Sequence, residues 1–253
     1  MEWNPRTTLG KEVARGEISD IGSVFVQGKK IQEPQIVDAL LPHLKSEIIL
    51  FGGSPGKGGG KKRTTTRRTV RMHRSGRRFT VSALALVGAP GYIGLGKASS
   101  QEHRVAIEKA VQTAKLNLIP IRRGCGSWQC SCHDEHSIPM KSHGKAGAIR
   151  VTLMPAPKGV GLCIGPEGRK VMRLAGIKDI WVDVIGDTRT RMNYIAALID
   201  AFRSLNKTRT ELPEIKEKEV AVAEPKEKKE VRKTEKAEDP EEDEDKEKVN
   251  ADE

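Results

Sequence analysis

The stretch Arg77-Arg-Phe-Thr-Val-Ser-Ala-Leu-Ala-Leu-Val87 joins two arginines to an apolar run of the length and composition that strands favour. The turn signal Ser75-Gly76 precedes it and predicts a hairpin. Gly91-Tyr-Ile-Gly-Leu-Gly96-Lys97 follows and predicts a second turn and a second short strand. Residues 101–117 then carry apolar side chains at helical spacing. Two or three antiparallel strands and one helix are therefore expected here.

The region from Ser54 to Arg78 contains ten lysines and arginines and no acidic residue. Arginines on a hairpin suit the binding of phosphates. We expect nucleic-acid contacts from these side chains: Arg67, Arg68, Arg71, Arg74, Arg77 and Arg78. Residues 52–68, rich in Gly, Lys and Arg, are either a flexible solvated loop or, as we favour, an arm that orders on RNA.

The charge of the chain is divided unevenly. Residues 211–253 hold 18 acidic and 10 basic residues, a net charge of −8, which leaves +19 on residues 1–210. Such a basic region points to a polyanion, either nucleic acid or an anionic membrane. No apolar run approaches the roughly 18 residues of a spanning helix, and Met1-Glu-Trp-Asn-Pro5 is no signal peptide, so we expect a cytosolic protein.

The glycine segment ending at Lys97-Ala98 differs by one residue from the phosphate-binding motif G-x-x-x-x-G-K-[ST] of nucleotide hydrolases. Ala98 lacks the hydroxyl that would hold magnesium. Residues 92–95 also alternate like a strand. We therefore expect the glycines to permit close backbone approach within a sheet, with a P-loop hydrolase as the weaker alternative.

Three thiols and an imidazole follow in Cys125-x4-Cys130-x-Cys132-x3-His136. This set could close a tetrahedral zinc site, although the spacing is not a common finger pattern and His133 could replace His136. Reduced thiols in a structured loop are the main alternative. A catalytic Cys–His pair is disfavoured, because no neighbouring residue suggests an orienting acid.

The pattern of residues 137–205 predicts several strands and two helices. Strands are expected at 138–140, 148–154 and 180–185, with Cys163 as a core residue. Gly165-Pro-Glu-Gly168 resembles the GXXG loop of KH domains, so a free KH-like regulator that binds single-stranded RNA is an alternative function. Arg189 and Arg191 oppose the dipole of the final helix, so we expect a bound phosphate there and no purely structural role.

The two ends of the chain differ in character. Residues 1–45 predict short helices that are too few to form a core and must pack on a neighbour. Residues 208–253 are rich in Glu and Lys with few apolar side chains, and we expect them to be disordered.

Taken together, residues 1–208 resemble the universal small-subunit ribosomal protein number five, with an N-terminal part similar to its archaeal branch. Six motifs carry the resemblance: Trp3-Asn-Pro-Arg-Thr7, Glu33-Pro-Gln-Ile-Val-Asp-Ala-Leu-Leu-Pro42, Ser75-Gly-Arg-Arg78, Asn117-Leu-Ile-Pro-Ile-Arg-Arg-Gly124, Val151-Thr-Leu-Met-Pro-Ala-Pro-Lys-Gly159 and Arg173-Leu-Ala-Gly-Ile-Lys-Asp179. The archaeal likeness rests on the first two and on Cys125-Gly-Ser-Trp128.

The resemblance implies an α+β fold. A domain like those that bind double-stranded RNA would span residues 46–118, a connecting loop 119–136, and a second domain with a left-handed crossover 137–207. It also implies a non-catalytic protein of the small ribosomal subunit that binds rRNA, contacts small-subunit proteins four and eight, lies near the mRNA entrance and influences decoding accuracy. Gly94, Lys97, Arg122 and Arg123 carry over as further rRNA contacts.

Overall fold

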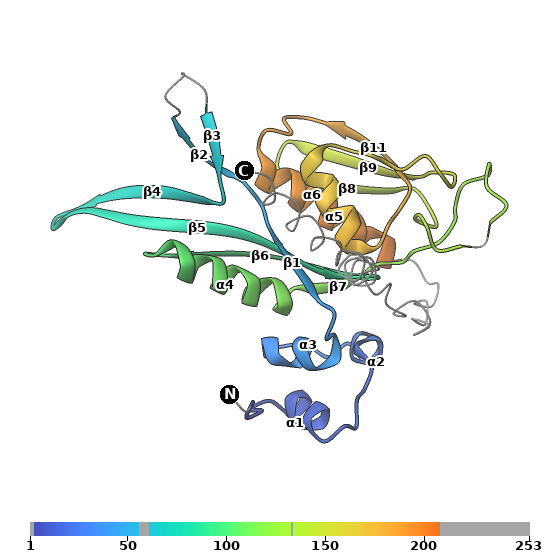
Figure 1. The fold of residues 1–253 in the computed structure, drawn as a ribbon, viewed down its shortest axis with the longest axis horizontal. Helices are drawn as coiled ribbons and strands as arrows, with labels where there is room; N and C mark the ends of the chain where they lie inside the picture. Colours follow the sequence, from blue (N-terminus) through green and yellow to red (C-terminus); the bar gives the residue numbers. More distant parts are fainter. Residues whose placement is uncertain (1–2, 56–60, 133, 208–253) are drawn as a thin grey trace, which may run out of the picture. The chain divides into compact units, whose positions relative to one another are not determined.

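The computed structural model describes residues 3–55, 61–132 and 134–207. The chain divides into two units, Met1–Ile215 and Lys216–Glu253. The expectations for the tip of the basic arm, for His133 and for the tail at 208–253 therefore lie outside the described residues. The described part mixes helices and strands, which confirms the predicted combination of α and β structure (Figure 1).

The first sheet is built around the long strand β5, which pairs along one edge with β1 and β4 and along the other with β6. All neighbouring strands run antiparallel. The five strands are β1 (Lys45–Ile48), β4 (Thr66–His73), β5 (Gly76–Ala89), β6 (Tyr92–Ser100) and β7 (Leu118–Pro120).

Helix α4 (His103–Leu116) covers one face of this sheet (Figure 1). Its buried Ala106 and Ala110 pack against Val81, Ala83 and Ala85 of β5. Small side chains on both elements allow the helix to approach the sheet closely.

The second sheet has the order β10-β11-β9-β8, and two helices pack with it. Its elements are β8 (Ser142–Ala146), β9 (Ile149–Pro155), β10 (Leu162–Cys163), α5 (Pro166–Ala175), β11 (Ile180–Ile185) and α6 (Arg191–Asn206). The parallel pair β10–β11 is joined through α5. Leu153, Met172 and Phe202 are among the fully buried side chains of the core that these elements share with the first sheet.

Three short helices precede the first sheet: α1 (Thr8–Ala14), α2 (Ile21–Val26) and α3 (Pro34–Leu40). Their buried apolar residues form one cluster with Tyr92 of β6 and Leu118 of β7. Phe25 stacks on Tyr92 with ring centroids 5.8 Å apart. The helices therefore bury their apolar faces against the first sheet of the same chain.

Two local expectations were wrong. Residues 138–140 form no strand, because Ile138 enters the core from a loop whose backbone pairs with Gly126. The strand that pairs with β9 in this region is instead β8. Cys163 is exposed and not in the core.

The basic arm, expected as a flexible loop or as an arm that orders on RNA, has regular strands at its described ends. Its described ends, β2 (Gly52–Pro55) and β3 (Lys61–Thr64), pair antiparallel. Main-chain hydrogen bonds form this ladder, and such bonds do not require apolar side chains. Within the part of the chain described here, no helix is long and apolar enough to span a membrane.

Candidate functional site

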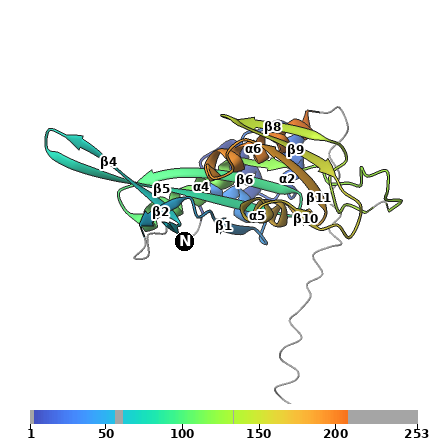
Figure 2. The ribbon, with the colours of Figure 1, turned by 90° about the horizontal axis from the view of Figure 1, so that it is seen from above.

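The hairpin of β4 and β5 extends beyond the rest of its sheet. β6 ends at Ser100, which pairs with Val81, so in the described structure no third strand accompanies residues 69–80. Two perpendicular views show this end of the hairpin projecting past α4 (Figures 1 and 2). A two-stranded ribbon without further support is only marginally stable in water, so a partner is expected to complete it.

The projecting ribbon is basic on both faces. Every residue from Arg67 to Thr80 is exposed except Gly76, which is half-buried. The segment has no aspartate or glutamate and carries all six hairpin arginines predicted to bind nucleic acid. Arginines on both faces of a ribbon can reach phosphates on either side of it.

Two of these arginines lie directly opposite each other, because Arg71 pairs with Arg78 across the hairpin. Like charges at opposed positions destabilise a sheet. Among the described residues, the arginines with acidic partners lie elsewhere: Arg15, Arg104, Arg123 and Arg191. A bound polyanion would relieve the repulsion at this pair.

The face of the ribbon that α4 covers farther along β5 is partly apolar. Val70 and Phe79 are opposite each other and are 49% and 42% exposed, and Met72 is 71% exposed. Exposed apolar side chains grouped beside arginines are typical of a binding surface.

Two further predicted RNA contacts lie on β6 and differ in exposure. Lys97 is exposed, whereas Gly94 is buried. A Cβ at Gly94 would lie 2.2 Å from the carbonyl oxygen of Ala114 on α4. The close approach of the α4 backbone, as predicted for these glycines, therefore explains why position 94 is a glycine. Lys97 presents its side chain to solvent.

The predicted contacts Arg122 and Arg123 follow β7. Arg122 is only 7% exposed. The guanidinium of Arg123 forms an ion pair of 3.0 Å with Glu135 in the connecting segment. Both side chains are thus engaged with the protein rather than displayed on its surface.

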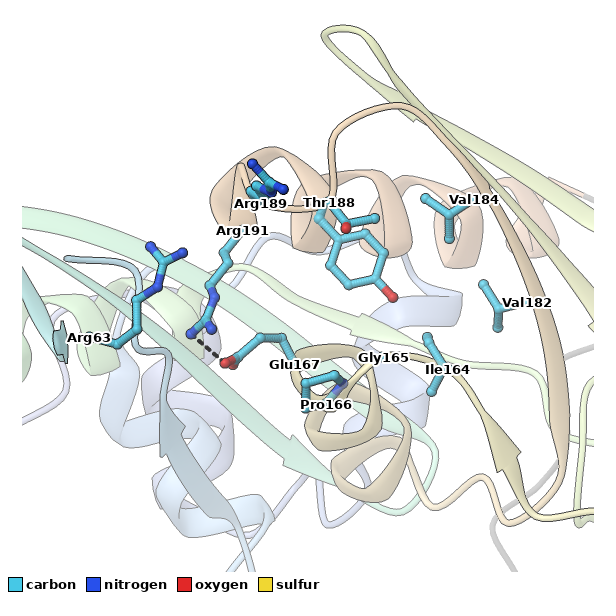
Figure 3. A pocket seen from close by; sticks show the side chains of 11 residues that line it. Arg63, Ile164, Gly165, Pro166, Glu167, Val182, Val184, Thr188, Arg189 and Arg191 are labelled. Atoms are coloured by element: carbon cyan, nitrogen blue, oxygen red, sulfur yellow. Dashed lines mark ion pairs between the residues drawn. The ribbon is translucent and has the colours of Figure 1, made fainter. Parts of the chain in front are cut away.

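Arg189 and Arg191 lie near the start of α6 (Figure 3). Arg189 is exposed, whereas Nη1 of Arg191 forms an ion pair of 2.6 Å with Glu167 of α5 and also donates to the carbonyl oxygen of Leu50. Arg191 therefore has a structural counter-charge on a different helix, and the predicted RNA contact of Arg191 stays a prediction.

The GXXG segment is the first turn of α5 rather than a free loop. Gly165 is the N-cap, Glu167 is buried, and a Cβ at Gly168 would lie 2.3 Å from Ile164 Cδ1. A KH-type clamp needs an accessible loop that can grip the nucleotide backbone. This packing counts against the KH-like alternative.

The glycine segment at 91–97 belongs to a regular strand. Residues from Tyr92 to Ser100 pair continuously with β5, and Gly96 is buried under α4. A phosphate-cradling loop needs free backbone N–H groups, which a paired strand does not offer. The P-loop interpretation is therefore wrong.

The four predicted metal ligands converge. The three Sγ atoms of Cys125, Cys130 and Cys132 and a ring nitrogen of His136 all lie within 4.8 Å of one another. Cys125 Sγ is 3.7 Å from Cys132 Sγ, and Cys130 Sγ is 3.8 Å from His136 Nε2. Zn–S bonds of about 2.3 Å place tetrahedral ligand atoms about 3.8 Å apart. Cys130 Sγ and Cys132 Sγ, at 2.8 Å, would separate by about 1 Å to fit.

Two of the thiols, Cys130 and Cys132, are within hydrogen-bond distance of each other. A hydrogen bond from Cys132, with help from the backbone of Lys158, lowers the pKa of Cys130 to about 6. The same bond raises the pKa of Cys132 to about 11. The lowered pKa favours the thiolate form of Cys130, which is the form that binds metal ions.

The sequence did not point to the group that orients His136. Asp179 Oδ2 lies 2.9 Å from His136 Nδ1, and both residues are buried. The one sequence signal for Asp179 was its place at the end of the Arg173-Leu-Ala-Gly-Ile-Lys-Asp179 motif. The orienting acid that a catalytic Cys–His pair would need is thus present. A catalytic pair, however, uses a single thiol, whereas three convergent thiols are typical of a metal site.

Comparison with known proteins defines the class. Residues 61–122 match the family model described as ribosomal protein S5, N-terminal domain, and residues 144–218 match ribosomal protein S5, C-terminal domain. The small ribosomal subunit protein uS5 of Methanothermobacter thermautotrophicus is 44% identical over 216 residues, which cover 85% of this chain and 93% of that protein.

Two other archaeal relatives agree. The uS5 protein of Methanocaldococcus jannaschii is 44% identical over 83% of this chain and 90% of its own length. That of Pyrobaculum arsenaticum is 45% identical over 80% of this chain and 93% of its own length. The chain therefore belongs to the small ribosomal subunit protein uS5 family, in its archaeal type. All three of these relatives are named as proteins of the small ribosomal subunit.

Proposed function

We propose that the protein is a structural constituent of the small ribosomal subunit, in the cytoplasm, and that it binds rRNA through the β4–β5 hairpin. The observation that carries this proposal is the projecting ribbon, with six exposed arginines and no acidic residue between Arg67 and Thr80. Ribosomal RNA supplies the dense phosphates that such a ribbon requires. Lys97 and Arg189, exposed on other elements, would add contacts outside the hairpin.

The finer description of the fold also belongs to this proposal. Residues 46–118 would act as a domain like those that bind double-stranded RNA, which the antiparallel sheet backed by α4 supports. Residues 137–207 would form the second domain, with a left-handed β10–α5–β11 crossover. Crossover connections between parallel strands of one sheet are right-handed in about 98% of cases, so a left-handed connection would be unusual. An experimental structure with a right-handed connection would overturn this part.

The proposed neighbours rest on the resemblance to the family. We propose small-subunit proteins four and eight as protein contacts, with the protein near the mRNA entrance and with an influence on decoding accuracy. Cross-linking of intact small subunits, followed by mass spectrometry, should join this protein to both neighbours. Cross-links to other proteins alone would exclude that location.

No cofactor is needed for the binding of rRNA, but we also propose that Cys125, Cys130, Cys132 and His136 bind one zinc ion. The four ligand atoms come from one short segment and face one another, which reduced thiols with unrelated roles have no reason to do. Three thiolates and one imidazole are an established ligand set for structural zinc.

Sedimentation tests the ribosomal role. A tagged full-length chain in native lysate is separated on a magnesium gradient, and every fraction is blotted before and after EDTA. We expect the protein to co-migrate with the small subunit and to move with it when ribosomes dissociate. Protein mainly in the light fractions would overturn the ribosomal function and would favour a free RNA-binding regulator.

A further inference from the structure

Asp179 lies at the centre of several contacts between segments that are distant in sequence. The residue precedes β11 and is 5% exposed. Its Oδ2 accepts from His136, and its Oδ1 accepts from the backbone N–H groups of Gly159 at 3.1 Å and Gly161 at 2.7 Å. Since a buried carboxylate is costly unless its oxygens are satisfied, this arrangement holds both groups of donors in place.

The hydrogen bond to Asp179 also determines which nitrogen of His136 is available. A carboxylate accepts, so the ring donates from Nδ1, and the lone pair of the neutral ring is on Nε2. Nε2 is the nitrogen that faces Cys130 Sγ at 3.8 Å. Histidines that bind zinc commonly donate their other ring N–H to a carboxylate in this way.

Backbone groups on both sides of the His136–Asp179 contact also form hydrogen bonds. The N–H groups of Lys178 and Asp179 donate to the carbonyl oxygen of His136 at 2.9 and 3.1 Å. The N–H of Ala156 donates to the buried Oγ of Ser137 at 3.2 Å. These hydrogen bonds hold the end of the connecting segment, which carries the thiols, against residues 156–161 and the start of β11.

Gly159 and Gly161 have φ angles of +94° and +74°, in the left-handed region that favours glycine. Their turn directs two N–H groups at one carboxylate oxygen. The order of this turn thus depends on the position of Asp179. That position is in turn held by the hydrogen bond between Asp179 Oδ2 and His136.

We propose that Asp179 is a positioning residue of the zinc site, and that zinc, His136 and Asp179 form one continuous link from the connecting segment to the turn at 159–161. The inference rests on the proposed zinc site. With a metal ion at Nε2, the imidazole of His136 would stay in one orientation and its Nδ1–H would stay on Asp179. Metal occupancy would then affect the order of the turn at 159–161, which contributes no ligand.

The variant Asp179→Asn separates this role from a purely structural one. Asparagine Oδ1 can still accept from Gly159 and Gly161, but its amide cannot accept from Nδ1–H of His136. The imidazole would then carry its proton on Nε2 and lose the lone pair that zinc needs. Asp183→Asn is the matched control, because Asp183 is exposed on β11, the strand that directly follows Asp179.

Zinc affinity of the purified full-length chain is measured by competition with a chromogenic chelator. We expect one zinc per wild-type chain, unchanged affinity in Asp183→Asn, and affinity about 10- to 100-fold lower in Asp179→Asn. A wild type without zinc would remove the proposed site itself. Wild type and Asp179→Asn with equal affinity would leave the site and overturn the positioning role alone.

A second measurement needs no variant. Hydrogen exchange of the Gly159 and Gly161 amides in the wild type is followed before and after zinc is removed with a chelator. We expect both amides to lose protection on removal and to regain it when zinc is returned. Protection that does not change in a protein shown to lose its zinc would contradict the link to the turn.

Discussion

The guanidinium of Arg68 lies over the ring of Phe79, with its central carbon 3.6 Å from the ring centroid. The two residues are diagonal neighbours across the hairpin, because Arg68 pairs with Val81 and Phe79 with Val70. The contact is made in the projecting ribbon, where few other contacts restrict an arginine. It therefore holds one of the six arginines in a defined position before RNA binds.

Replacement of the ring should weaken binding without changing its electrostatics. A cation–π contact at an exposed site contributes about 0.5–1 kcal/mol, so we expect Phe79→Leu to lower rRNA affinity about 2- to 5-fold. The dependence of affinity on salt should stay as it is, because no charge is removed. Phe79→Tyr keeps the ring and should bind like the wild type. Filter binding over a range of salt concentrations measures both quantities, and a changed slope for Phe79→Leu would contradict this explanation.

Removal of charge from the hairpin should change that slope. We expect Arg77→Gln with Arg78→Gln to weaken rRNA binding and to reduce the slope of log affinity against log salt by up to about two units. The control is Arg15→Gln with Arg104→Gln, which removes the same charge from residues paired with Glu17 and Glu108. An unchanged slope in the hairpin variant would exclude these two arginines from the RNA surface.

Gly96 should tolerate no side chain. Its Cβ would lie 2.0 Å from the carbonyl oxygen of Ala110 and 2.3 Å from the backbone nitrogen of Ala114. Because α4 would have to move off the sheet, we expect Gly96→Ala to lower the free energy of unfolding by about 3 kcal/mol or more. Urea denaturation followed by circular dichroism measures the loss.

Gly22→Ala is the control for this prediction. Its Cβ would meet only the hydroxyl of Tyr92, at 3.5 Å, within helix α2. We expect stability equal to the wild type or greater by about 0.5–1 kcal/mol, since alanine favours helix over glycine. Equal losses in the two variants would show that the close approach of α4 is not the cause.

Glu33 should make the N-terminal helices sensitive to acid. Its carboxylate accepts from the indole N–H of Trp3 and from the backbone N–H groups of Arg6 and Thr7. Partial desolvation raises the pKa of Glu33, but these hydrogen bonds outweigh it, and the pKa lies below its ordinary value of 4.5. Stabilisation by the carboxylate is therefore complete above that value and is lost as the pH falls through the lowered pKa.

The fluorescence of Trp3 can follow this loss in a variant with Trp128→Phe and Trp181→Phe. We expect the signal to change below pH 4.5 while the far-UV circular dichroism of the sheets is retained. Glu33→Gln cannot accept from all three donors and should show the changed signal already at neutral pH. A pH profile shared by both proteins would exclude Glu33 as the titrating group.

The sequence by itself determined those features that neighbouring residues encode. The apolar run of β5, the helical stripe of α4 and the arginines around Ser75-Gly76 are local patterns, and each occurs in the structure where it was expected. The close spacing of the three cysteines with His136 also sufficed to propose their convergence. Local patterns succeed here because periodicity along a few residues decides which face of an element is buried.

Tertiary structure alone decided the contacts between distant segments. It gave Arg191 its partner Glu167 and His136 its partner Asp179, and it placed Ile138 in the core without a strand. None of these contacts follows from residue type or spacing, because each is made only when separate elements pack and buried polar groups must find partners. The physical reason is that a buried polar group must form a hydrogen bond or an ion pair, and the fold determines which residue lies close enough to form it.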